Sequence, residues 1–183
     1  MKLKSILTLF FVLGITAFAQ IKRVDGEVTG KYYNQVWNTI TEQPVIVYVD
    51  LEQNVYIKGG EGLLAATCYV RGKQLREVIN AFEKSIEWSK KSLENKLETT
   101  KLLSSFVTFE DGSKQGLEMF FKSFDKGQIT FVILKINDFN NPFSDIKILL
   151  EHEQVTELIE LLKKVKETYK ELKVQEANSD ILQ

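Results

Sequence analysis

The feature that most constrains this sequence is an order of elements that occurs twice: several strand-like segments, then one long amphipathic helix. In the second half, apolar residues recur from 153 to 172 at the three- and four-residue spacing of a helix. In the first half the same spacing begins at Lys73 and reaches position 97. Blocks of strands followed by a helix favour antiparallel pairing with helices on one face. The sequence therefore predicts an α+β fold with antiparallel sheets and two long amphipathic helices.

Apolar alternation and turn residues place the individual strands. The predicted strands are 36–40, 45–50, 54–58 and 63–70 in the first half, and 104–110, 117–124, 128–136 and 145–150 in the second. Asp111-Gly112 and Asp125-Lys126-Gly127 are turn signals of the kind that close hairpins. The second of these turns predicts that 117–124 and 128–136 pair as one hairpin.

The two strand-to-helix junctions match at an offset of 80 residues, with four identical pairs: Gln74/Gln154, Glu77/Glu157, Ile79/Ile159 and Lys84/Lys164. This predicts an internal duplication of a strands-then-helix (ββββα) unit, with repeats at 28–101 and 104–174. The alternative is that any amphipathic helix after a strand produces such a match. We expect a single α+β domain over 20–175 and a flexible C-terminal tail over 176–183.

The N-terminal residues 1–19 have the pattern of a signal peptide. Two lysines precede an uncharged run of 13 residues from Ile6 to Phe18, and Ala17-Phe18-Ala19 is a small-x-small cleavage site. The run is shorter than the roughly 20 residues of a spanning helix. We predict cleavage between Ala19 and Gln20 and a secreted or periplasmic product with no transmembrane anchor. The basic residues are mostly lysine, which favours a bacterial source.

Composition excludes several chemistries. One histidine and one cysteine cannot build a Cys/His zinc cage or an intrachain disulfide. His152 lies at the predicted start of the last helix, where capping or solvent exposure is expected, and Cys68 alternates with apolar residues and is expected to be buried. Asp50, Glu52 and Glu61 lack the spacing of a calcium loop. We predict no catalytic residue, cofactor or metal site.

Three aromatic residues near the mature N-terminus, Tyr32, Tyr33 and Trp37, are the candidate recognition residues. Aromatic side chains of this kind stack on sugars or bases or anchor an interface. The alternative is that they cover an edge of the core.

The strand predicted at 128–136 is apolar on both faces, with Phe131 and Ile133 on one and Val132 and Leu134 on the other. A sheet covered by helices on one side should have a polar second face. Something is therefore expected to cover the second face of the 117–136 hairpin. The candidates are the other half of the chain, a second copy in a homo-oligomer, and an apolar ligand.

These observations predict an exported, non-catalytic binding or interaction domain. The alternative is a carrier that holds an apolar small molecule or lipid between sheet and helices. A duplicated ββββα order is similar to the Whirly and PUR-type families, and this topological resemblance implies binding of single-stranded nucleic acid. Cleavage of the signal leaves 22 basic and 25 acidic residues, a net charge of −3, so nucleic-acid binding is disfavoured.

Overall fold

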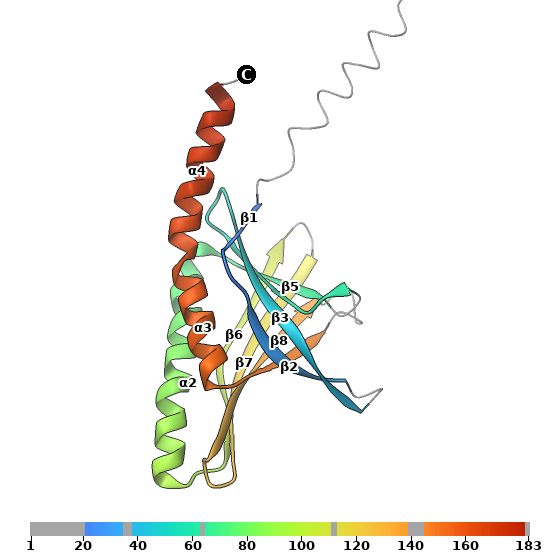
Figure 1. Cartoon of the computed structure of the whole chain (residues 1–183), viewed down its shortest axis with the longest axis vertical. Helices are drawn as coiled ribbons and strands as arrows, with labels where there is room; N and C mark the ends of the chain where they lie inside the picture. The colour runs from blue at the N-terminus through green and yellow to red at the C-terminus, as the bar shows by residue number, and fades with distance from the viewer. Residues whose placement is uncertain (1–20, 35–37, 63–64, 111–112, 139–144, 182–183) are drawn as a thin grey trace, which may run out of the picture.

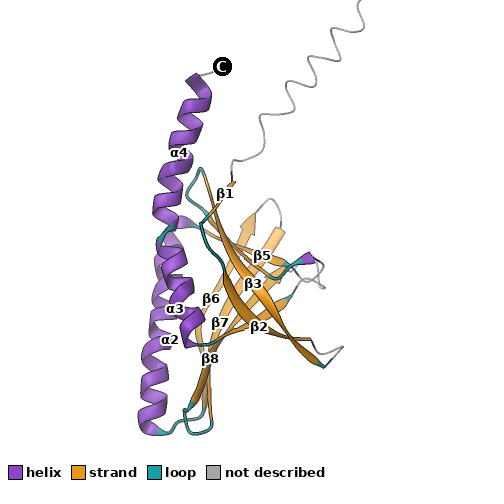
Figure 2. Ribbon diagram, viewed as in Figure 1, coloured by secondary structure: helices purple, strands orange, loops and turns teal. Residues whose placement is uncertain are grey.

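The structure is a computed structural model that describes residues 21–34, 38–62, 65–110, 113–138 and 145–181. Its centre is an antiparallel sheet of nine strands, and the helices gather along one side of it (Figures 1 and 2). The predicted α+β class is confirmed. The strands of both halves belong to one continuous sheet rather than to separate sheets.

The elements of the first half are β1 (Ile21–Arg23), β2 (Val28–Asn34), β3 (Thr39–Asp50), β4 (Val55–Gly59), β5 (Ala66–Val70), the short 3-10 helix η2 (Gly72–Gln74) and α2 (Leu75–Asn95). Those of the second half are β6 (Thr99–Glu110), β7 (Ser113–Phe124), β8 (Ile129–Asp138), β9 (Ile146–Leu150), α3 (His152–Lys163) and α4 (Val165–Ile181). The strand order is β5-β4-β3-β2-β9-β8-β7-β6, with β1 beside β3. The pairing of β2 with β9 therefore joins the two halves at the centre of the sheet.

Three regions differ from the sequence-based expectation. Strands β1 and β2 were not predicted, because 21–34 shows no sustained apolar alternation. The single helix expected over 153–172 is two helices, since α3 ends at Lys163 and α4 begins at Val165. Val165 continues the apolar stripe, so periodicity gives no sign of this break. Helix α4 then runs to Ile181, past the start predicted for the C-terminal tail. Residues 36–37 of the first predicted strand lie outside the described residues.

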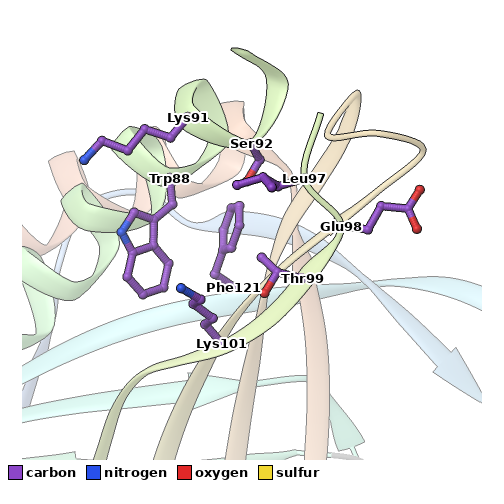
Figure 3. Close-up of a pocket in the computed structure, with 8 residues that line it drawn as sticks. All are labelled: Trp88, Lys91, Ser92, Leu97, Glu98, Thr99, Lys101 and Phe121. Carbon is purple, nitrogen blue, oxygen red and sulfur yellow. The ribbon is translucent and has the colours of Figure 1, made fainter. Parts of the chain in front are cut away.

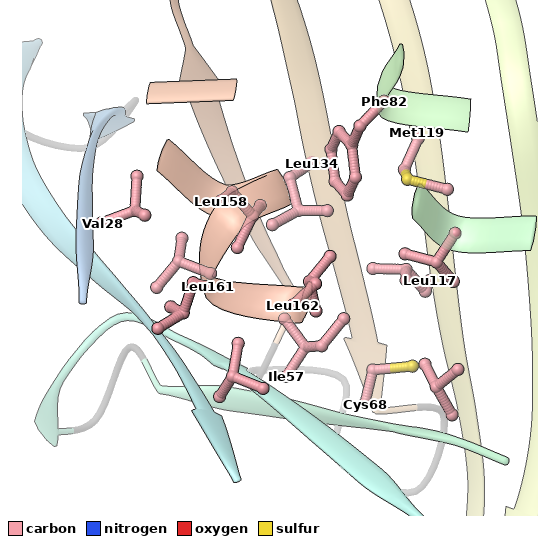
Figure 4. Close-up of a cluster of buried hydrophobic side chains, with 14 of the residues drawn as sticks. Val28, Ile57, Cys68, Phe82, Leu117, Met119, Leu134, Leu158, Leu161 and Leu162 are labelled. Carbon is pink, nitrogen blue, oxygen red and sulfur yellow. The ribbon is translucent and has the colours of Figure 1, made fainter. Parts of the chain in front are cut away.

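The core forms where α2 and α3 lie against the curved sheet. Figure 4 shows Leu158, Leu161 and Leu162 of α3 pointing inward toward side chains of the sheet, with Phe82 of α2 beside them. Each fully buried side chain of this size stabilises the fold by roughly 1.5–3 kcal/mol. Ile159 is buried as well, which confirms the predicted stripe of the last helix.

The sheet curves far enough that β5, at one end of the strand order, reaches the strands at the other end. The Tyr69 N–H donates to Gln115 Oε1 (2.9 Å), and the Tyr69 carbonyl accepts from the Thr108 hydroxyl (2.7 Å). In β4, a Cβ on Gly59 would lie 2.9 Å from side-chain atoms of Ile136 and Ile148. Strands of the first half therefore face strands of the second across the core.

This curvature gives the two faces of the β7–β8 hairpin different environments. The inward side chains are buried: Leu117, Met119, Phe121, Val132, Leu134 and Ile136. On the opposite face Phe120, Phe131 and Ile133 are half-buried, and Phe124 and Ile129 are exposed. One apolar face is thus covered within the chain, and the other is turned outward. Among the described residues, no helix is both long and apolar enough to cross a lipid bilayer.

Candidate functional site

The structure does not bring the predicted aromatic residues Tyr32 and Tyr33 together. They are consecutive in β2, and consecutive strand residues point to opposite faces of a sheet. Tyr32 is half-buried against the core. Tyr33 is exposed, and its hydroxyl donates to Asn38 Oδ1 at 2.5 Å. Trp37 lies outside the described residues, so a recognition role for this group stays a prediction.

His152 and Cys68 occupy the positions that the sequence predicted for them. His152 is the exposed first residue of α3, next to the N-cap Glu151, whose N–H donates to Gln154 Oε1 (2.8 Å). Cys68 is fully buried in β5, and this burial raises its pKa to about 12. The thiol therefore stays protonated and unreactive near neutral pH.

The carboxylate of Asp50 shapes a turn. It accepts the backbone N–H groups of Glu52 (2.9 Å) and Asn54 (2.8 Å), and the Tyr56 hydroxyl (3.1 Å). These bonds occupy its oxygens within the β3–β4 connection. In the part of the chain that the structure describes, no three His, Cys, Asp or Glu side chains are placed to hold a metal ion.

The most developed site is an apolar pocket of about 340 Å³ between the last turns of α2, the start of β6 and the end of β7. Figure 3 shows Trp88 and Phe121 side by side in its lining, with Leu97 next to Phe121. The Trp88 and Phe121 rings meet edge to face, 5.7 Å apart at 77°. The complete lining is Trp88, Lys91, Ser92, Leu97, Glu98, Thr99, Lys101 and Phe121.

The pocket exists because α2 packs tightly against the sheet over its first turns but less tightly after Ser85. Val78, Ala81, Phe82 and Ser85 are buried, whereas Trp88 on the following turn is only half-buried. Contact returns at Ser92, whose carbonyl lies against the β7–β8 turn. A Cβ on Gly127 of that turn, at φ +80°, would be 2.1 Å from the Ser92 oxygen. Only glycine fits both the left-handed backbone and this close approach.

Hydrogen bonds hold this end of the molecule around the pocket. The Ser123 hydroxyl donates to the Leu97 carbonyl (2.9 Å) and accepts the Thr99 N–H (3.1 Å). The Lys126 N–H donates to Glu98 Oε1 (3.0 Å). The Glu98 carboxylate points away from the pocket in Figure 3 and toward the β7–β8 turn that contains Lys126.

Lysine side chains supply the charge near the pocket. The Lys101 ammonium lies 5.4 Å from the Trp88 ring centre, and that of Lys84 lies 4.8 Å from it. Such cation–π contacts hold the positive charges close to the aromatic wall. Lys91 stands on the opposite side of Trp88, directed outward (Figure 3). The pocket therefore offers an apolar interior with ammonium groups nearby.

Sequence reasoning missed this site because each of its aromatic residues fits a core pattern. Trp88 lies in an amphipathic helix, and Phe121 alternates with Leu117 and Met119 in a strand. Neither pattern shows that a space remains between the helix and the strand beside Trp88 and Phe121. The one available signal is the pair Lys90-Lys91, which follows Trp88 after a single serine.

Comparison with known proteins adds no assignment to this geometry. No protein-family model matches the chain, and no curated protein matches its sequence. What the described residues define is an α+β protein with a buried core and an apolar pocket bordered by lysines. The functional argument accordingly starts from that pocket.

Proposed function

We propose that this chain is an exported, non-catalytic binding protein that takes a small apolar molecule into the Trp88 pocket. The observation that carries the proposal is the pocket itself, where the half-buried Trp88 and the exposed Leu97 provide an apolar lining next to the buried Phe121. Its volume of about 340 Å³ falls within the 300–1,000 Å³ range of small-molecule sites. The location between helix and sheet is the one expected for the carrier alternative.

The charges around the pocket select the class of ligand. Lys101 lies over Trp88, Lys91 is at the mouth, and the Glu98 carboxylate is engaged by the backbone of Lys126. An anionic group at the end of an apolar body would meet ammonium groups there while its apolar part covers Trp88 and Phe121. The ligand proposed is therefore an acyl chain or aromatic body with one carboxylate or similar anion.

A fluorescent probe of this chemistry, 8-anilinonaphthalene-1-sulfonate, tests the site directly. We expect saturable binding to the folded protein, displaced by dodecanoate. The variant Trp88→Ala should lower the affinity about tenfold, equivalent to about 1.4 kcal/mol, because it removes the aromatic wall. The matched control is Trp37→Ala, which changes the other tryptophan of the chain.

The control also separates the two recognition hypotheses. Binding that survives Trp88→Ala and is lost in Trp37→Ala would contradict the pocket and favour the group of Tyr32, Tyr33 and Trp37. Circular dichroism of both variants establishes that they are folded. Equal loss in two folded variants, or no saturable binding by the wild type, would also overturn the proposal.

The anion preference has its own test at Lys101. Lys101→Met keeps much of the side-chain length and removes the charge. We expect it to weaken dodecanoate binding severalfold while leaving dodecanol binding unchanged, since only the carboxylate interacts with the ammonium group. Equal effects on both ligands would assign Lys101 a purely apolar role.

Export and the absence of catalysis are parts of the same proposal. The 1–19 pattern supports export, and N-terminal sequencing of secreted or periplasmic protein should begin at Gln20. None of the eight described residues lining the pocket is a histidine, cysteine or aspartate, which supports a binding role. A hydrolase activity abolished by a single substitution would contradict the non-catalytic assignment.

We also infer that the two halves derive from an internal duplication. The matched glutamines support it, because each occupies the N3 position of a capping box at the start of a helical segment. Gln74 Oε1 accepts the Arg71 N–H (3.3 Å), and Gln154 Oε1 accepts the Glu151 N–H (2.8 Å). Identical residues at the offset of 80 thus perform the same local task after β5 and after β9.

A further inference from the structure

Exposed apolar side chains gather at the end of the molecule where α2 meets the β7–β8 turn, the lower end in Figure 1. Ten large apolar side chains are exposed in the described part of the chain, and five lie in the segments that form this end. We call these five the apolar rim: Leu93, Leu97, Leu102, Phe124 and Ile129, with exposed fractions between 37% and 57%. Phe124 pairs with Ile129 across the hairpin, and its ring contacts that of Phe131.

The same end is basic in a chain that is slightly acidic overall. Segments 88–102 and 120–130 contain six lysines, at 90, 91, 96, 101, 122 and 126, against three acidic residues, at 94, 98 and 125. Their net charge is thus +3, whereas the whole chain carries −1. The Lys122 ammonium lies 4.4 Å from the Phe124 ring centre. Its apolar stem is therefore available to lie along the rim with the charge at the water side.

We infer that the apolar rim and its lysines dock on the surface of an anionic lipid membrane. Surface-bound proteins place apolar side chains at the boundary of headgroups and acyl chains, with lysines among the headgroups. Lysines close to an anionic leaflet are attracted by its negative surface potential. A second copy of this chain is a poorer occupant, because it would bring two sets of six lysines together. The inference goes beyond the proposed function, and the pocket opens at the same end.

Quenching of Trp88 by brominated lipid tests this orientation. The sequence has two tryptophans, so Trp37→Phe in the full chain leaves Trp88 as the single reporter. We expect brominated phosphatidylglycerol vesicles to quench it, and salt to weaken the quenching because it screens the lysines. Brominated phosphatidylcholine vesicles should have little effect. Every variant retains residues 1–19, so any contribution of that apolar segment is common to all.

Matched pairs of substitutions locate the surface. In the Trp37→Phe background, Leu93→Asp with Ile129→Asp should weaken quenching by phosphatidylglycerol vesicles about tenfold or more, the equivalent of about 1.4 kcal/mol. The control, Ile21→Asp with Ile40→Asp, changes two equally exposed apolar residues elsewhere and should leave it unchanged. Neither Leu93 nor Ile129 lines the pocket, so probe binding should persist in the rim variant.

Four results would overturn the inference. Equal quenching in the rim and control variants would show that another surface binds. Equal quenching by neutral and anionic vesicles would remove the role of the lysines. A concentration-dependent dimer lost in Leu93→Asp, or displacement of vesicles by a single-stranded oligonucleotide at low salt, would assign the surface to another partner. Loss of probe binding with vesicle docking intact would instead overturn the proposed pocket function alone.

Discussion

Helices α2 and α3 both come after a strand, α2 by way of the short helix η2 and α3 directly after β9, yet they cover the sheet differently. Helix α3 has 12 residues, and five of them are buried apolar side chains: Val155, Leu158, Ile159, Leu161 and Leu162. Helix α2 has 21 residues, and its buried apolar side chains all lie in the first turns: Val78, Ala81 and Phe82. Helix α3 packs against the core along its whole length. Helix α2 packs against the core only over its first turns and then continues past them.

The difference shows how a pocket arises without a change of fold. Where α2 has the buried Ser92 in place of a large apolar residue, the helix still follows the sheet but leaves space beside Trp88. A leucine-rich face such as that of α3 would fill this space. Buried apolar side chains are therefore concentrated on α3, and the Trp88 pocket lies toward the end of α2.

The largest expected effect is in α3, the helix whose apolar side chains are buried in the core. Ile159→Asp introduces a carboxylate at a position that is 3% exposed, with an expected cost of more than about 4 kcal/mol. We expect loss of the cooperative thermal transition measured by circular dichroism. The matched change is Ile129→Asp in the apolar rim. Because this side chain is 54% exposed, the variant should remain folded. Similar melting temperatures for the two variants would contradict the difference in burial between Ile159 and Ile129.

Gly127→Ala tests whether the end of α2 is fixed by the turn beneath it. The added Cβ meets the Ser92 carbonyl at 2.1 Å on a left-handed backbone, so we expect a loss of about 3 kcal/mol in urea unfolding. The control is Gly62→Ala, also at positive φ (+57°) but with no atom within 4 Å of the new Cβ. It should cost only about 1 kcal/mol. Equal losses would mean that the contact with Ser92 contributes nothing.

Glu118 gives a pH-dependent test on the outward face of the hairpin. The hydrogen bond from Lys135 (2.7 Å), with a second from Asn137, holds the pKa of the Glu118 carboxyl below its usual value. A lowered folded-state pKa adds stability above the unfolded-state pKa of about 4.3, and this is lost as pH falls through the folded value. Wild type should therefore exceed Glu118→Gln in urea stability at about pH 6, and this advantage should shrink toward about pH 3. A pH-independent difference would exclude the linkage.

The smallest effects compare the two helix starts. Gln74→Ala and Gln154→Ala each remove one side-chain hydrogen bond to an N-cap backbone N–H, worth about 0.5–1 kcal/mol. We expect the larger loss at Gln154, whose bond is shorter (2.8 Å against 3.3 Å). Differential scanning calorimetry of both variants measures it. A loss at one position only would argue against equivalent roles for the two glutamines.

Much of the strand pattern was predictable because local signals determine it. Residues 45–50, 117–124 and 128–136 alternate and are bounded by turns; the first two segments fall within strands of the structure, and the third does so from Ile129 onward. Strand β2 was missed because its sequence, VTGKYYN, is held by pairing with both β3 and β9. Hydrogen bonds to distant strands leave no mark on local periodicity.

The sequence by itself determined that α2 and α3 are amphipathic, that Cys68 is buried and that the β7–β8 hairpin has two apolar faces. Only the tertiary structure decided which of those faces is the core. Curvature of the sheet turns Val132 and Leu134 inward, beneath α3 and opposite the first half, and turns Phe131 and Ile133 outward. The Trp88 pocket was likewise decided by the tertiary structure. It forms where α2 and β7 no longer pack tightly against each other, and these two segments are far apart in the sequence.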